Sequence, residues 1–82
     1  MRVSVDISLY PLQEDLIPPI LDVIERLKRD PDLDVATNPM STQIRGEYDR
    51  VMELLQTEMK ITFEALPKAV FVIKILNNPI AD

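Results

Sequence analysis

The first ten residues alternate between apolar and polar side chains without interruption. Side chains of a β-strand point alternately to the two faces of its sheet, so this pattern predicts a strand that is buried on one face only. The buried face would carry Val3, Val5, Ile7 and Leu9. The opposite face would carry Ser4, Asp6, Ser8 and Tyr10. The strand therefore leaves a stripe of hydrogen-bonding groups, with one carboxylate, outside the core.

Two helical patterns follow this strand. The first begins at Pro18-Pro19 and is expected to end near Asp30-Pro31, because residues before proline avoid the helical conformation. Its apolar stripe contains Ile17, Ile20, Leu21, Ile24 and Leu27. Its charged face, which we expect to be solvated, contains Asp22, Glu25, Arg26, Lys28 and Arg29. The second helix follows Gly46, buries a stripe from Tyr48 to Phe63 and ends around Leu66-Pro67.

Three more extended segments complete the pattern. Leu33 to Asn38 and Thr42 to Gly46 are expected to form a hairpin around Asn38-Pro39, and Ala69 to Leu76 a last strand. The order predicts one α+β domain over residues 1–82, a ferredoxin-like βαββαβ sandwich with two helices on one face of a four-stranded antiparallel sheet. Ser41, Gln43 and Arg45 would then lie beside the stripe of the first strand, provided Thr42, Ile44 and Gly46 face the helices. The last strand is apolar on both faces, so we expect its outer face to be covered.

Composition excludes several functional classes. The chain has no cysteine and no histidine, which removes thiolate chemistry and the commonest general base and metal ligand. A net charge of −5 with scattered basic residues argues against a nucleic-acid surface. No segment is typical of a signal peptide or a membrane span, so we expect a cytoplasmic protein.

No catalytic constellation emerges from the sequence. The single glycine, Gly46, leaves no phosphate-cradling loop, and the segment after the first strand is acidic and contains no glycine, so an acylphosphatase-type enzyme is excluded. We therefore expect neither catalytic residues, nor a metal site, nor a cofactor.

Two groups of polar residues are candidates for a binding site. Asp6 is a poor strand former in a central strand, so it needs a partner: either a cross-strand ion pair with Arg45 or a cationic ligand, and the two are compatible. Around the hairpin, Thr37, Asn38, Ser41 and Thr42 supply donors and acceptors in close order. Turn formation alone also explains Asn and Ser at such positions.

Three motifs carry a resemblance to a known family. They are Asp6-Ile7-Ser8-Leu9-Tyr10-Pro11-Leu12, Val35-Ala36-Thr37-Asn38-Pro39-Met40-Ser41-Thr42, and Ile44-Arg45-Gly46-Glu47-Tyr48-Asp49 with Val51-Met52 following. In this order they resemble the YkoF-like thiamine-binding proteins, of which this chain looks like the short, single-domain form. The resemblance implies the ferredoxin-like fold, a non-catalytic role in binding thiamine or its hydroxymethylpyrimidine part as a carrier or sensor, and a homodimer or homotetramer formed through the sheet and residues 69–76.

The resemblance also implies roles for the polar residues. Asp6 would face the thiazolium cation or the amino group, while Ser8, Thr37, Asn38, Ser41 and Thr42 would fix the pyrimidine edge. Tyr10 would stack or contribute a cation–π contact, and Val70 and Val72, from this or a neighbouring subunit, would form an apolar wall. The alternative is a structural or regulatory oligomerisation domain without a small-molecule ligand, whose polar stripe serves the subunit interface.

Overall fold

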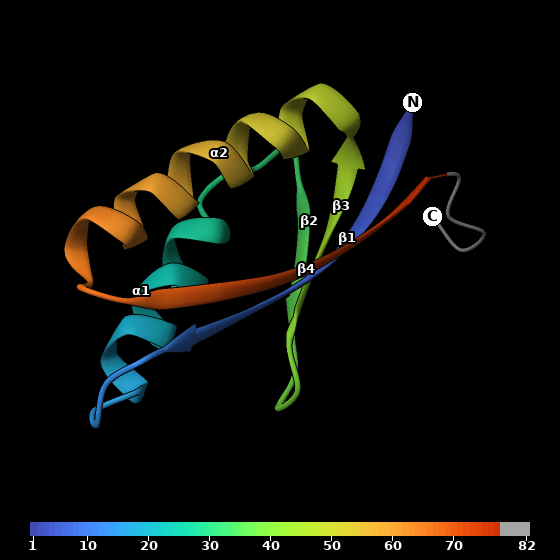
Figure 1. The fold of residues 1–82 in the computed structure, drawn as a ribbon. Coiled ribbons are helices and arrows are strands. Elements are labelled where there is room, and N and C mark those ends of the chain that lie inside the picture. Colours follow the sequence, from blue (N-terminus) through green and yellow to red (C-terminus); the bar gives the residue numbers. More distant parts are fainter. Residues whose placement is uncertain (78–82) are drawn as a thin grey trace.

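Four strands form one antiparallel sheet, and two helices pack on one of its faces (Figure 1). This computed structural model describes residues 1–77. The elements are β1 (Arg2–Pro11), α1 (Ile17–Leu27), β2 (Asp34–Thr37), β3 (Thr42–Glu47), α2 (Tyr48–Ala65) and β4 (Ala69–Asn77). The strand order β2-β3-β1-β4 places β1 and β3 in the centre. The predicted ferredoxin-like βαββαβ sandwich is thus confirmed.

The core lies between the sheet and the helices. The four apolar residues that alternate along β1 are all buried, and Ile44 of β3 is fully buried beside them. Val23 and Leu27 of α1 and Val51 and Leu55 of α2 close the core from the other side. Thr42 and Gly46 also face the helices, which leaves the polar residues of β1 and β3 together on the outer face of the sheet, as predicted.

Helix α1 differs from its prediction in both length and orientation. It ends at Leu27. The loop that follows begins with a tight turn, in which the Arg29 N–H donates a hydrogen bond to the Arg26 carbonyl. Ile17 and Leu21, predicted to be buried, are 60% and 59% exposed. The buried face instead includes Val23 and Arg26.

Among residues 1–77, no helix is long and apolar enough to cross a bilayer.

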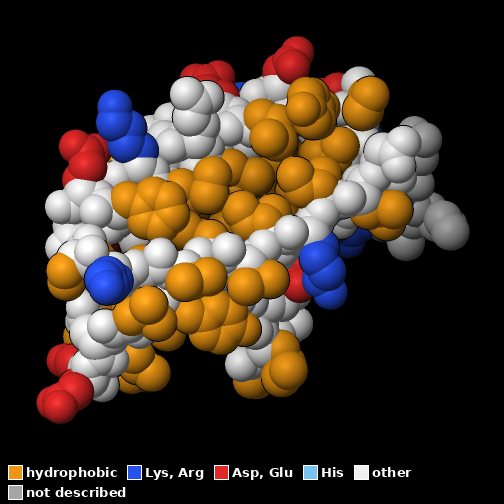
Figure 2. Space-filling model, in the orientation of Figure 1, with side chains coloured by type: hydrophobic (Ala, Val, Ile, Leu, Met, Phe, Trp, Pro, Cys, Tyr) orange, Lys and Arg blue, Asp and Glu red, His pale blue; other side chains and the backbone are white. Residues whose placement is uncertain are grey.

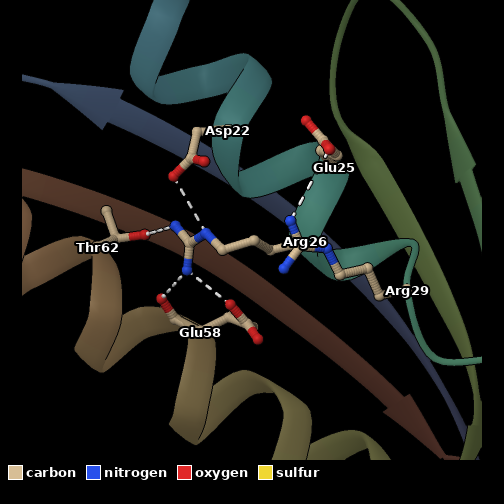
Figure 3. A network of polar contacts seen from close by, with 6 residues as sticks. All are labelled: Asp22, Glu25, Arg26, Arg29, Glu58 and Thr62. Carbon is tan, nitrogen blue, oxygen red and sulfur yellow. Dashed lines mark hydrogen bonds and ion pairs between the residues drawn. The ribbon is translucent and has the colours of Figure 1, made fainter.

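Arg26 corrects the prediction of a solvated charged face. Its side chain lies between the two helices, where Nη1 contacts Glu58 Oε2 at 2.6 Å and Nη2 donates to Thr62 Oγ1 at 2.7 Å (Figure 3). The Nε atom pairs with Asp22 one turn earlier in α1, at 3.1 Å. A buried guanidinium needs such partners, since desolvation without them is costly. The charged face of α1 is therefore partly an interhelical contact.

Gly46 leaves space for the side chain of Leu33. A Cβ atom built on it would lie 2.3 Å from Cδ2 of Leu33 and 3.4 Å from Cγ2 of Val51. Leu33 follows the loop after α1 and is buried against the end of β3, so the backbone of β3 must approach it closely. The sequence alone does not reveal this reason for the glycine.

Strand β4 lies at one edge of the sheet, with an exposed outer face and an inner face on which Ala69, Phe71 and Ile73 are half-buried against the core. Val70 and Val72 on its outer face are 44% and 51% exposed. Apolar side chains also gather between β4 and α2, where Met52, Met59 and Phe63 line a shallow groove (Figure 2). Phe63 packs edge-on against Phe71 of β4, with ring centroids 5.5 Å apart. Half of the Phe63 side chain nevertheless stays exposed.

Candidate functional site

The candidate site is a cavity of about 470 Å³ between α1, the end of β1 and the β2–β3 hairpin. It exists because β1 is longer than its neighbour β3. Pairing of β1 with β3 ends at Ile7 opposite Thr42, while pairing with β4 continues to Pro11 opposite Ala69. Beyond Ile7, the side of β1 that faces away from β4 lies open toward the hairpin.

Apolar side chains make most of the cavity wall. They come from β1, the loop after it, α1, the hairpin and β4: Ile7, Leu9, Pro11, Leu12, Leu16, Ile20, Val23, Ile24, Leu27, Pro39, Met40 and Phe71. No charged side chain is among the described residues that line the cavity. Such a wall accommodates a flat, uncharged ring more readily than a phosphate group.

Polar groups complete the lining, and they are the residues that the sequence analysis singled out. Six of the seven predicted site residues line this one cavity: Ser8, Tyr10, Thr37, Asn38, Ser41 and Thr42. The seventh, Asp6, does not line it. The structure brings these side chains together because the end of β1 and the hairpin tip lie at the same end of the sheet. Their role in binding stays a prediction.

Asn38 holds the hairpin in shape. Its Oδ1 accepts the N–H groups of Met40 at 2.8 Å and Ser41 at 3.0 Å, and its own N–H donates to the Ser41 carbonyl at 3.0 Å. The turn-forming interpretation of Asn38 therefore applies alongside its position in the cavity lining. Below the turn, the hydroxyls of Thr37 and Thr42 lie 3.2 Å apart. These contacts fix the polar side of the cavity.

Asp6 lies on the outer face of β1 and contacts the cavity through Ser41. Its Oδ1 accepts the Ser41 hydroxyl at 2.5 Å and the Gln43 amide at 3.0 Å, and its Oδ2 lies 3.7 Å from Lys74 Nζ. The hydrogen bonds from Ser41 and Gln43, and then the charge of Lys74, lower the pKa of Asp6 below its usual value of 3.8. Asp6 is therefore ionised at neutral pH.

Lys74 is the cationic partner that the structure shows for Asp6. Arg45 was the predicted partner, but the register places Arg45 opposite Ser4 on one side and Asp34 on the other. Gln43 and Lys74 are the residues directly opposite Asp6. Alternation alone puts Arg45 and Asp6 on the same face, whereas their relative position depends on a strand register that one sequence does not reveal.

Two further features of the site were not predicted. The sequence predicted that Gln43 lies on the outer face but suggested no role for it. In the structure its side chain forms hydrogen bonds with Asp6, Ser41 and Asn38. The apolar wall was assigned to Val70 and Val72, which do not line the cavity within this chain; Phe71 and residues of α1 take that place. A possible signal was the alternation of β4, in which Phe71 faces opposite to its two valine neighbours. Among residues 1–77, no three carboxylates are arranged to hold a metal ion.

Comparisons with known proteins agree with this architecture. MJ1052, a hypothetical protein of Methanocaldococcus jannascii, superposes with a TM-score of 0.83 at 23% sequence identity. The match covers 99% of this chain and 84% of the MJ1052 chain. TM0486 of Thermotoga maritima, provisionally assigned to thiamine biosynthesis or salvage, gives a TM-score of 0.83 at 22% identity. This match covers 92% of this chain and 82% of the TM0486 chain. SP2199 of Streptococcus pneumoniae gives a TM-score of 0.78 at 19% identity, and the match covers 98% of this chain and 90% of the SP2199 chain. At these identities the likeness shows the fold alone.

The fold places the chain among the ferredoxin-like α+β proteins. Residues 5–79 match the model of a family described as thiamine-binding protein. The chain belongs to the thiamine-binding protein family, as the motifs of β1 and the hairpin indicated. A comparison with curated proteins gives no match.

Proposed function

We propose that the chain binds thiamine, or the hydroxymethylpyrimidine part of thiamine, without catalysing a reaction on it, and that it acts as a carrier or sensor of this ligand. The observation that carries the proposal is the cavity, which joins an apolar wall to hydroxyl and amide groups. Its volume of about 470 Å³ lies in the range typical of small-molecule sites. Membership of the thiamine-binding protein family supports the same ligand class.

The chemistry of the lining favours the pyrimidine half of thiamine. An uncharged aminopyrimidine is flat and carries donors and acceptors at its edge, which suits the apolar wall and the side chains of Thr37, Asn38 and Ser41. The thiazolium cation would stay at the mouth, near the ring of Tyr10, which is 53% exposed. Because the described lining residues include no Lys or Arg, a diphosphate would gain little here.

The test is isothermal calorimetry of the purified protein with thiamine, hydroxymethylpyrimidine and thiamine diphosphate. We expect saturable binding of the first two and weaker binding of the diphosphate. A folded protein that binds none of the three would contradict the proposal and favour the alternative, an oligomerisation domain without a small-molecule ligand.

A pair of variants on α1 locates the binding site. Leu16 lines the cavity at the start of the helix, whereas Leu21 lies on the same helix outside the lining, and both side chains are exposed enough to be replaced by a larger one. We expect Leu16→Trp to fill the mouth and weaken thiamine binding about tenfold or more, while Leu21→Trp binds normally. Equal affinities would place the ligand elsewhere.

We further propose that the chain forms a homodimer or homotetramer through the outer face of the sheet and β4. The half-exposed Val70 and Val72 and the apolar side chains on both faces of this edge strand support the proposal (Figure 2). Light scattering at micromolar concentration is expected to return at least a dimer. A monomer would contradict this part of the proposal.

A further inference from the structure

We infer that Asp6 and Gln43 make Ser41 an acceptor, and not a donor, toward the cavity, so that the cavity selects a ligand that presents an amino or other N–H donor to Ser41. The inference rests on the proposed function, because it concerns the same cavity. It adds the chemical group that the cavity recognises, and it gives Asp6 a positioning role through Ser41 instead of direct contact with the ligand.

One end of the hydrogen-bond network has fixed polarity because it is a carboxylate. An ionised carboxylate only accepts hydrogen bonds, so the 2.5 Å contact between Ser41 Oγ and Asp6 Oδ1 uses the hydroxyl hydrogen of Ser41. The same oxygen of Asp6 accepts a second hydrogen bond, from the Gln43 amide, and Lys74 lies near the other. These partners favour the charged form of Asp6, which keeps it an acceptor.

The other end of the network is fixed by backbone amides. The N–H groups of Met40 and Ser41 only donate, so the atom of Asn38 that contacts them must be its oxygen. The side-chain nitrogen of Asn38 then points to Gln43 Oε1, at 3.4 Å. The amide of Gln43 is oriented accordingly, and its nitrogen faces Asp6 and Ser41.

The two ends determine what Ser41 has left to offer. A hydroxyl has one hydrogen and two lone pairs. Ser41 donates its hydrogen to Asp6 and accepts from Gln43 Nε2 at 2.7 Å, so one lone pair remains. Ser41 is among the residues that line the cavity, and the inference assigns this remaining acceptor to the ligand. A ligand oxygen at this point would place two acceptors against each other.

Thiamine and oxythiamine differ in the group that this arrangement discriminates. Thiamine carries an amino group on its pyrimidine, and oxythiamine carries an oxygen there. Calorimetric titration of the unmodified protein with each compound is expected to show thiamine binding about tenfold or more tightly, since a desolvated acceptor without a donor is unfavourable.

Variants of the network test the cause of this preference. In Asp6→Asn the new amide can donate to Ser41, which frees the hydroxyl hydrogen of Ser41 for the cavity, and Ser41→Ala removes the acceptor. We expect the ratio of the two affinities to fall toward one in both variants. Asp34→Asn is the matched control, because Asp34 is a carboxylate on the edge strand β2, outside the cavity lining and opposite Arg45. This variant is expected to keep the preference.

The outcomes separate this inference from the proposed function. If thiamine and oxythiamine bind the unmodified protein equally, the cavity is a thiamine site but Ser41 does not discriminate, and the inference is overturned alone. If neither binds, both proposals fail. Circular dichroism checks that each variant is folded. If Asp6→Asn is unfolded, the test rests on Ser41→Ala: a folded Ser41→Ala that still prefers thiamine over oxythiamine overturns the inference.

Discussion

Arg26 is a charged side chain that α1 buries, and two of its partners, Glu58 and Thr62, are distant in the sequence. The side chains of Arg26 and Glu58 are only 9% and 14% exposed, and 32 residues separate them along the chain. The contact therefore ties the last turn of α1 to the second half of α2. Buried ion pairs contribute little compared with an apolar pair, but removal of one partner leaves the other charge uncompensated.

Arg26→Met is expected to lower the free energy of unfolding by about 3 kcal/mol, because Glu58 loses its counter-charge. Arg29→Met is the control on the same helix. Arg29 pairs with Glu25 at 3.8 Å with both side chains largely exposed, so this change should stay within about 0.5 kcal/mol. The measurement is urea unfolding.

A double variant separates the lost charge balance from lost packing. Arg26→Met with Glu58→Met removes both buried charges, so we expect it to recover much of the stability lost in Arg26→Met alone. Equal stability of Arg26→Met and Arg29→Met would show that the interhelical contact does not matter.

Gly46→Ala is expected to destabilise the fold by about 1–3 kcal/mol, since the added methyl group overlaps the buried side chain of Leu33. The matched test repeats the change in a Leu33→Ala background, where the space is open. There Gly46→Ala should be clearly less destabilising, as judged by urea unfolding of all four proteins. The same loss in both backgrounds would mean that Leu33 is not the cause.

Strands and helices differed in how far the sequence predicted them. Alternation predicts both faces of β1 and β3, because a strand has only two faces and one of them was apolar. The orientation of α1 was partly wrong, because the stripe through Ile17 and Leu21 and the stripe through Val23 both satisfy helical spacing. In the structure Val23 is buried, and the same orientation of α1 brings Arg26 to Glu58, a contact between distant segments.

The residues of the candidate site also differ in how far the sequence predicted them. Its polar residues were predictable because they lie at a strand end and a tight turn, where local sequence signals are strong. Its apolar wall was not, because Phe71 reaches the cavity only through the pairing of Leu9 with Phe71 between β1 and β4. The register of a sheet is a long-range property.

Asp6 connects three strands, and its ionisation gives the sheet a pH dependence. The hydrogen bonds from Ser41 and Gln43 lower its pKa in the folded state, so ionised Asp6 stabilises the fold above its usual pKa of 3.8. This contribution is lost as the pH falls through the lower, folded-state pKa. The stability difference between the unmodified protein and Asp6→Asn should therefore be constant near neutral pH and shrink well below pH 3.8. A difference that stays unchanged in acid would contradict this assignment.

The last prediction concerns how assembly and ligand binding relate to each other. Val72 lies on the outer face of β4, opposite Ser8 of β1, and is not among the residues that line the cavity. If β4 forms the subunit contact, Val72→Lys places a charge in an apolar interface and should yield a monomer by light scattering. Leu21→Lys, at a similarly exposed position on α1, should leave the assembly intact.

The same monomeric variant decides whether a neighbouring chain is needed for binding. Because Val72 does not line the cavity, we expect Val72→Lys to keep its affinity for thiamine within about threefold. Its thermal midpoint should also lose the dependence on protein concentration that an oligomer shows. If the monomer instead loses thiamine binding while it remains folded, a neighbouring chain must complete the cavity, and Val70 and Val72 would then be the first candidates for the missing wall.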